Sequence, residues 1–178
     1  RTAEGNAALD VRDGAVSCED TSIRSMSFNL LVHNMTEARV ERVLTMIRKH
    51  LPDTLGVQEA SEAWMAALRD GLGTEYASVG VGRDAGGSGE HSAIFYRRAL
   101  FEVEESGTRW LTGTPDTVSR VDGSICNRIF TYAILRRRTD GKRFLCVNTH
   151  TDHAKDPAVR LAQVQALTAF LEKYAGVP

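Results

Sequence analysis

The sequence predicts an α/β or α+β fold in which a mixed β-sheet is flanked by helices. Apolar residues follow a strand period and then a helical period, twice in succession. Several short strands and a last helix come after these two pairs. This order of elements is typical of folds in which helices pack in layers against a sheet. A chain of 178 residues is also long enough for one domain with a substantial core.

The first expected strand and helix occupy residues 23–51. Polar and apolar side chains alternate in the strand, and the apolar ones are Met26, Phe28 and Leu30. Thr36 is the expected N-cap of the helix, and Pro52 stops it. The apolar positions of this helix follow helical spacing and are Val40, Val43, Leu44, Ile47 and Leu51.

A second strand and helix are expected within residues 54–73. Thr54–Val57 is a short apolar strand, and a helix begins after it at Ser61. Gly71 and Gly73 mark the end of that helix. Its apolar face consists of Trp64, Met65, Leu68 and Leu72.

A run of strands follows, with a helix after it. The expected strands are residues 76–81, 92–97, 101–108, 129–136 and 143–149. Thr139-Asp140-Gly141 predicts a hairpin turn between the last two. Asp156 is the expected N-cap of the final helix and Pro157 its first residue. The expected buried stripe of this helix consists of Leu161, Val164, Leu167, Leu171 and Tyr174.

Composition excludes several classes of protein. The formal net charge of -1 gives no overall attraction to nucleic acid or to an anionic membrane. No apolar run reaches the roughly 20 residues that a transmembrane helix needs, so no membrane insertion is expected. Cys18, Cys126 and Cys146 are odd in number and lack Cys-x-x-Cys spacing, which argues against a disulfide scaffold and a structural zinc site. The compartment stays open between a soluble cytoplasmic and an exported protein.

Residues 1–21 are small, polar and without a period. We interpret them as a leader or as the end of a preceding module. The folded domain is therefore expected to comprise residues 22–178.

Polar side chains follow three of the expected strands directly. These are Asn29, Glu59 and His150. In α/β sheets, ligands bind beyond strand ends, because side chains from several strands converge there. The repetition of this pattern predicts a functional site at one edge of the sheet.

Four motifs, in this order, resemble the endonuclease/exonuclease/phosphatase superfamily, which has the deoxyribonuclease I-like fold. They are Met-Ser-Phe-Asn at 26–29, Val-Gln-Glu at 57–59, the glycine-rich segment with its strand at 80–97, and Val-Asn-Thr-His-Thr-Asp-His at 147–153. The resemblance runs from about Ile23 to Tyr174. It implies a four-layer α/β sandwich and the hydrolysis of a phosphate ester with Mg²⁺ or Mn²⁺.

The resemblance assigns metal binding to Glu59, with Asn29 beside the metal. A carboxylate oxygen is the hard ligand that Mg²⁺ prefers, which agrees with this assignment. Taken alone, Glu59 also fits an exposed carboxylate at a strand end, and Asn29 a turn residue.

His150 is the expected catalytic histidine, with Glu90 as its hydrogen-bond partner by resemblance. A carboxylate partner would orient the imidazole and raise its pKa. Asp152 is a further catalytic candidate, because a bacterial subgroup carries it in the same motif. His153 is equally compatible with a place in the site and with a structural role.

Arg83, Arg128 and Asn148 are the expected substrate-binding residues. A guanidinium group can bind phosphate through two parallel hydrogen bonds. A solvated arginine is the alternative for Arg83 and Arg128. Trp110 either forms a wall of the pocket or packs in the core.

Other functions have weaker support. Gly80-x-Gly82-x-x-Ala85 matches a loose dinucleotide motif, but a strand follows it where a helix would have to bind pyrophosphate. His150 and His153 lack a third nitrogen or sulfur ligand nearby, which argues against zinc. A basic cluster flanks the hairpin turn, and we favour a solvated hairpin over a nucleic-acid contact; it consists of Arg136, Arg137, Arg138, Lys142 and Arg143.

The C-terminal half that the resemblance implies is not in this sequence. The family's Gly-Asp-x-Asn and Ser-Asp-His segments do not occur, so we expect association with the missing half or with a second copy of the chain. The main hypothesis is a metal-dependent phosphoesterase whose substrate is a small phosphate ester rather than nucleic acid. The alternative is a catalytically silent half domain that binds a phosphorylated ligand or a protein partner.

Overall fold

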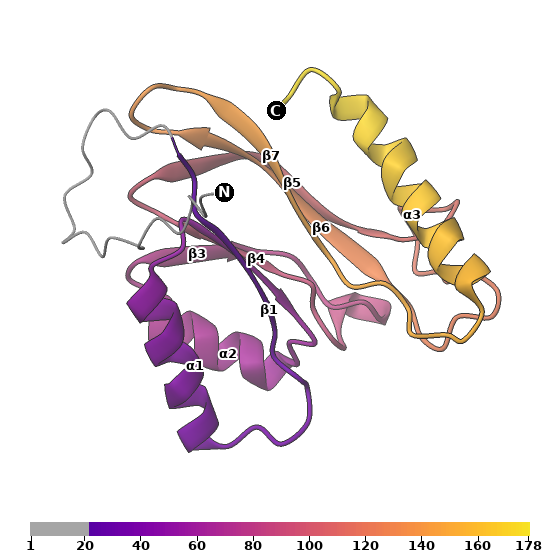
Figure 1. The fold of residues 1–178 in the computed structure, drawn as a ribbon, viewed down its shortest axis with the longest axis horizontal. Coiled ribbons are helices and arrows are strands. Elements are labelled where there is room, and N and C mark those ends of the chain that lie inside the picture. The colour runs from indigo at the N-terminus through magenta and orange to yellow at the C-terminus, as the bar shows by residue number, and fades with distance from the viewer. Residues whose placement is uncertain (1–21) are drawn as a thin grey trace, which may run out of the picture.

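The computed structural model describes residues 22–178 (Figure 1). The interpretation of residues 1–21 lies outside this range. The described part contains seven strands, three α-helices and two short 3-10 helices. The elements are β1 (Ser25–Asn29), α1 (Glu37–His50), β2 (Thr54–Gln58), α2 (Glu62–Leu72), β3 (Tyr76–Val79), η1 (Ala85–Gly87), β4 (Ile94–Arg97), β5 (Phe101–Trp110), β6 (Ile129–Arg137), β7 (Arg143–Thr149), α3 (Pro157–Leu171) and η2 (Glu172–Tyr174).

The strands form two sheets rather than one. The first sheet has the order β1-β2-β4-β3, with β1 parallel to β2 and β4 antiparallel to both of its neighbours. The second sheet is antiparallel, with the order β5-β6-β7. The mixed α/β class is therefore confirmed. The first sheet is the expected mixed sheet, and the strands from Phe101 onward pair only with one another and form the second.

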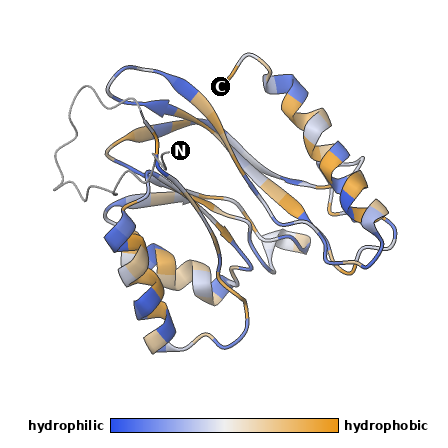
Figure 2. Cartoon of the chain, in the orientation of Figure 1, coloured by the Kyte–Doolittle hydropathy of each residue, from blue (hydrophilic) through white to orange (hydrophobic). Residues whose placement is uncertain are grey.

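Helices α1 and α2 cover the outer face of the first sheet (Figure 1). The Thr36 hydroxyl caps α1 by accepting the N–H of Arg39, and the Ser61 hydroxyl caps α2 by accepting the N–H of Trp64. Between helices and sheet lies a hydrophobic core that includes Ile47, Leu55 and Met65. Along both helices hydrophobic and hydrophilic residues alternate, as a single buried side requires (Figure 2).

The two sheets pack against each other through a second hydrophobic cluster. Ile94 of the first sheet contacts the inward side chains of the second sheet there, among them Phe101, Ala133 and Leu135. Residues of β6 from Ile129 to Leu135 are all buried, because one face of this strand meets the first sheet and the other meets α3. The central strand of the second sheet therefore reads as a continuous apolar run.

Helix α3 covers the other face of the second sheet, but not with the stripe that we expected. Leu167, Leu171 and Tyr174 do pack against Phe130 and Tyr132. The predicted stripe was wrong at its start, since Leu161 is 59% and Val164 48% exposed. The buried positions are Val159, Gln163 and Phe170 instead. Gln163 is polar, so hydropathy predicted it to be exposed. The buried face of the helix was therefore predicted at the wrong positions.

None of the helices in residues 22–178 is long and apolar enough to cross a membrane.

Candidate functional site

Three strand ends meet at one edge of the fold. Strands β1 and β2 are parallel, and Asn29 pairs in register with Gln58, which places Asn29 next to Glu59. The Asn29 Nδ2 donates to Glu59 Oε1 at 2.8 Å. His150, directly after β7, lies with its Nε2 3.4 Å from the same oxygen. The structure thus brings together the three residues that the strand-end pattern selected.

The backbone at this edge adopts an uncommon conformation. Glu59 and Leu31 both have positive φ, 54° and 53°, in the left-handed region that side chains other than glycine rarely adopt. The Leu31 N–H donates to Asn29 Oδ1 at 2.8 Å, and the Val32 N–H donates to Glu59 Oε2 at 3.3 Å. Strained residues of this kind cluster at functional sites, where the surrounding contacts hold them.

The charge states of Glu59 and His150 follow from their surroundings. Burial by itself would raise the pKa of Glu59, but hydrogen bonds from Asn29 and the Val32 N–H, together with nearby positive groups, lower it below its usual value. Burial lowers the pKa of His150, and Arg128 lowers it further, against the opposing effect of Glu59 and Glu90. At neutral pH the pair is therefore a carboxylate beside a neutral imidazole.

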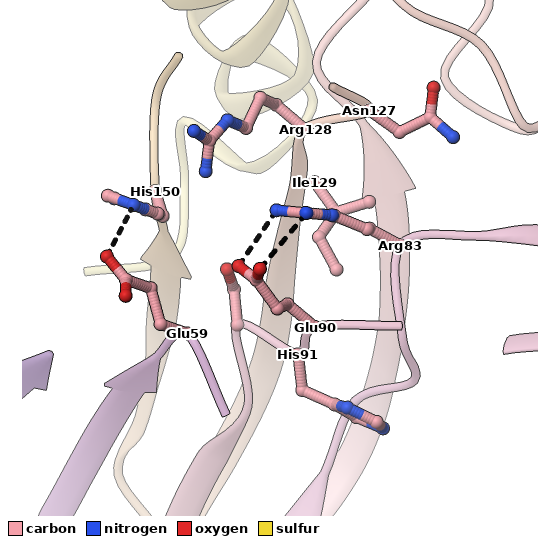
Figure 3. Close-up of a pocket in the computed structure, with 9 residues that line it drawn as sticks. Glu59, Arg83, Glu90, His91, Asn127, Arg128, Ile129 and His150 are labelled. Atoms are coloured by element: carbon pink, nitrogen blue, oxygen red, sulfur yellow. Dashed lines mark hydrogen bonds and ion pairs between the residues drawn. The ribbon is translucent and has the colours of Figure 1, made fainter. Parts of the chain in front are cut away.

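Glu90 does not form the expected hydrogen bond with His150. Its carboxylate instead binds both terminal nitrogens of Arg83, at 2.8 and 3.1 Å (Figure 3). The two residues face each other across the glycine-rich loop, where the Arg83 N–H also donates to the Glu90 carbonyl. The predicted pairing was wrong because this short loop places an arginine closer to Glu90 than the histidine of a distant strand.

Trp110 holds the glycine-rich loop in place. Its indole N–H donates to the Arg83 carbonyl at 2.8 Å, and Trp110 does not line the pocket. Asp84, the next residue of the loop, accepts a hydrogen bond from the Asn127 side chain at 2.9 Å. These contacts fix the position of Arg83 from two sides.

Arg128 is held by two residues of the segment that follows β7. Its Nε donates to Asp152 Oδ2 at 3.3 Å, and its Nη2 lies 3.0 Å from His153 Nδ1. The Arg128 side chain is only 5% exposed and that of Asp152 is fully buried. Asp152 was expected to be catalytic, but it lies behind Arg128 and does not line the pocket.

Asp152 also joins two backbone segments, residues 125–126 and the segment at Ala154. Burial alone would raise its pKa, but its carboxylate accepts the N–H groups of Ala154, Ile125 and Cys126 and the Nε of Arg128, which bring the pKa to about 2. The ordinary value is 3.8. Stability from this carboxylate is therefore fully present above about pH 4 and is lost as the pH falls toward 2.

We expect Asp152→Asn to lower the free energy of unfolding at pH 7 by about 2 kcal/mol. The difference between variant and wild type should shrink between about pH 4 and pH 2, because the wild-type carboxyl group then becomes protonated as well. Urea unfolding at several pH values measures this. A difference that stays constant down to pH 2 would contradict the assigned hydrogen bonds, and Asp70→Asn, at an exposed carboxyl group on α2, serves as the control.

Asn148 was expected to bind substrate, and the structure gives it another place. Its Nδ2 donates to the carbonyls of Val57 and Ala93, and its Oδ1 accepts from Gln58 at 2.6 Å. The side chain is buried and stands over Gly56, where a Cβ atom would lie 2.7 Å from Asn148 Cγ. Asn148 therefore links the second sheet to the first and does not line the pocket, and its role in substrate binding stays a prediction.

A small pocket lies at this edge of the fold and is lined by Glu59, Arg83, Glu90, His91, Ser92, Asn127, Arg128, Ile129 and His150 (Figure 3). The polar members His91, Ser92 and Asn127 were not predicted from the sequence. Their position next to Glu90 and Arg128 in the chain was the available signal. The lining combines two guanidinium groups, two carboxylates and two imidazoles.

The residues present fit a hard divalent cation with few protein ligands. No group of three or more His, Cys, Asp or Glu side chains that could hold a metal ion occurs within residues 22–178. Mg²⁺ keeps several water ligands and often binds through one or two carboxylates and substrate phosphate, so Glu59 alone can supply the main protein ligand. Asn29 donates its N–H to Glu59 and thereby orients the carboxylate.

The basic cluster at the hairpin is neutralised by acidic side chains. Arg136 and Arg138 contact Glu102, and Arg143 contacts Glu104 at 2.6 Å. On the other side, Arg137 and Lys142 contact Asp140. These ion pairs favour the interpretation of a solvated hairpin over a surface for nucleic acid.

A family model described as Endonuclease/Exonuclease/phosphatase family matches residues 26–178. No curated protein matches the chain.

Several solved structures are similar to this one. An endonuclease/exonuclease/phosphatase from Bacteroides vulgatus is 34% identical with a TM-score of 0.81, and the match covers 86% of this chain and 61% of that one. A mannosyl-6-phosphatase from Bacteroides thetaiotaomicron is 30% identical with a TM-score of 0.76, and the match covers 86% and 60%. The human Nocturnin catalytic domain shares the fold: it is 18% identical with a TM-score of 0.65, and the match covers 84% of this chain and 59% of that one. The chain thus spans about 60% of the length of these structures.

Proposed function

This chain belongs to the endonuclease/exonuclease/phosphatase family, and we propose that the full-length protein is a metal-dependent hydrolase of phosphate esters. The observation that carries the proposal is the group of Asn29, Glu59 and His150 at converging strand ends, beside Arg128 in one pocket. We further propose that the two sheets and their helices form part of the four-layer sandwich of the deoxyribonuclease I-like fold.

The charges of the pocket support a requirement for a cation. The two carboxylates that line the pocket, those of Glu59 and Glu90, balance the guanidinium groups of Arg83 and Arg128, and Asp152 adds a third carboxylate behind Arg128. A phosphate anion would therefore meet no net positive charge there. Mg²⁺ or Mn²⁺, held by Glu59, would supply it and stabilise the charge that develops on phosphoryl oxygens.

The protein groups then have separate roles. Glu59 holds the cation, and Asn29 keeps the Glu59 carboxylate in place. His150, a neutral imidazole beside Glu59, is in position to hydrogen-bond a phosphoryl oxygen or to transfer a proton to or from it. An arginine side chain of the pocket binds the remaining phosphoryl oxygens.

A small phosphate monoester is the favoured substrate class. The basic hairpin residues are already paired with acidic ones, so the hairpin offers no free basic track for a nucleic-acid backbone. One similar structure is named as a mannosyl-6-phosphatase, a name that describes a monoesterase. This likeness supports a sugar phosphate or a related small monoester.

The second candidate is a catalytically silent half domain that binds a phosphorylated ligand or a protein partner. It is favoured by one observation, that no group of three or more His, Cys, Asp or Glu side chains able to hold a metal ion occurs within residues 22–178. The Gly-Asp-x-Asn and Ser-Asp-His segments are also absent from the 178 residues. In this case the chain would associate with the segments that supply them or with a second copy of itself.

The test is hydrolysis by the full-length protein of p-nitrophenyl phosphate, mannose 6-phosphate and bis(p-nitrophenyl) phosphate. We expect turnover that EDTA abolishes and that added Mg²⁺ or Mn²⁺ restores, with the monoesters preferred over the diester. Turnover that resists EDTA would contradict metal dependence. Phosphate binding without any turnover would favour the silent half domain.

A further inference from the structure

We propose that Arg128 is the arginine that binds the substrate phosphoryl group, that Asp152 and His153 position it, and that Glu90 holds Arg83 out of this role. The inference rests on the proposed function, because it assigns the residues that bind phosphate in the same pocket. It separates Arg128 from Arg83, two arginines to which the sequence gave the same expected role, and it gives supporting roles to Asp152, His153 and Glu90.

Arg128 is placed to act on a ligand although it is almost buried. It lines the pocket, and its positive charge is close enough to lower the pKa of both Glu59 and His150. Its hydrogen bonds use Nε and Nη2, so within the described residues Nη1 is left for a ligand. A guanidinium fixed on one edge loses little freedom when it binds an anion with the other.

Arg83 is in the opposite situation. Both of its terminal nitrogens bind Glu90, and its Nε is buried without a hydrogen-bond partner in the part of the chain that the structure describes. To bind phosphate through its fork, Arg83 would have to break two charge-assisted hydrogen bonds. The pair therefore acts as a rigid wall of the pocket.

Asp152 positions Arg128 in two ways. Its carboxylate compensates the buried guanidinium directly, at 3.3 Å from Nε. It also binds the N–H groups of Ile125 and Cys126, which lie just before Arg128 in the chain. The backbone N–H of Asp152 donates to Gln163 on α3, so the carboxylate itself is anchored to a helix.

His153 completes the support from the outside. It is exposed, and its Nδ1 accepts a hydrogen bond from Arg128 Nη2 when the ring is neutral. A substitution at this exposed position changes the support of Arg128 with little effect on the core. His153 thus offers a second way to test the role of Asp152 without disturbing the fold.

The test combines two readouts on the full-length protein with Mg²⁺ present: the Kd of inorganic phosphate by calorimetry, and KM and kcat for p-nitrophenyl phosphate. We expect Arg128→Met to raise the Kd and KM about 100-fold and Asp152→Asn about tenfold, since hydrogen bonds to charged groups have effects of this size. In Asp152→Asn, kcat should change much less than KM. Arg83→Met should change the phosphate Kd less than threefold.

A double-mutant cycle separates positioning from a merely structural role. If Asp152 acts through Arg128, the double variant Asp152→Asn/Arg128→Met should bind phosphate no more weakly than Arg128→Met alone. Tyr76→Phe is the control, because it removes a buried hydrogen bond to the Pro52 carbonyl, before the start of β2, and contacts neither Asp152 nor Arg128. We expect it to reduce stability and to leave the phosphate Kd unchanged.

His153 covers the case in which Asp152→Asn does not fold. His153→Ala should raise the phosphate Kd about threefold, and His153→Asn, whose amide oxygen can replace Nδ1 as acceptor, should restore most of the affinity.

The outcomes distinguish this inference from the proposed function. Turnover with a phosphate Kd that is unchanged in Arg128→Met, or additive losses in the double variant, would overturn the inference and leave the function standing. Absence of turnover together with the expected losses of phosphate affinity would support the inference while the proposed hydrolase fails.

Discussion

Glu59→Gln is expected to reduce the hydrolysis of phosphate esters by the full-length protein on the order of 10³-fold. Glutamine keeps the size and shape of the side chain, so the loss comes from the negative charge that holds the cation. The single amide oxygen of glutamine can still accept one of the two hydrogen bonds, from Asn29 or from the Val32 N–H. Initial rates with p-nitrophenyl phosphate at saturating Mg²⁺ measure the effect.

Glu75→Gln is the matched control for this experiment, because Glu75 is an exposed glutamate between α2 and β3. Its rates should equal those of the wild type. Turnover by Glu59→Gln within a few-fold of the wild type would show that the carboxylate is not needed, and the proposed role of Glu59 would have to be abandoned.

Asn148→Leu is expected to lower the free energy of unfolding by about 3 kcal/mol, because it removes three hydrogen bonds between the sheets and leaves buried polar groups unpaired. Leucine cannot replace these bonds, and the space above Gly56 is already filled by the asparagine. Urea unfolding of the purified protein measures the change.

The matching control is Gln165→Leu, which changes an exposed amide on α3 to the same residue. Its free energy of unfolding should stay within about 0.5 kcal/mol of the wild type. A similarly small effect at Asn148 would mean that this residue does not link the sheets, and its expected role in substrate binding would deserve a new test.

The elements of the fold were predictable from local signals. Alternation at Met26 and Phe28, the caps at Thr36, Ser61 and Asp156, and Pro157 at the start of α3 all mark real boundaries. The division of the strands into two sheets was not predictable in the same way. Alternation says which residues share a face of a strand, but it does not say which strand lies beside it.

The sequence predicted which residues lie in the candidate site better than it predicted which of them contact one another. Asn29, Glu59 and His150 meet as expected, because strand ends that share a sheet edge converge. Which carboxylate reaches the histidine depends on the path of the glycine-rich loop and on the side chains opposite. That is why Glu90 was expected at His150 but lies on Arg83.

Buried polar residues were the most frequent source of error. Asn148, Asp152 and Gln163 are residue types usually found at the surface or in a site. Each is nevertheless buried here, and its side chain binds backbone groups. A polar residue next to a motif is therefore compatible with both catalysis and support, and only the positions of its partners decide between them.

The central claim, that Glu59 holds a catalytic divalent cation, is tested most directly by a crystal of the full-length protein soaked in MnCl₂. We expect an anomalous peak at about 2.2 Å from a Glu59 carboxylate oxygen, lost in crystals of Glu59→Gln. A well-ordered pocket without a peak at Glu59, or a peak that persists in Glu59→Gln, would contradict the account.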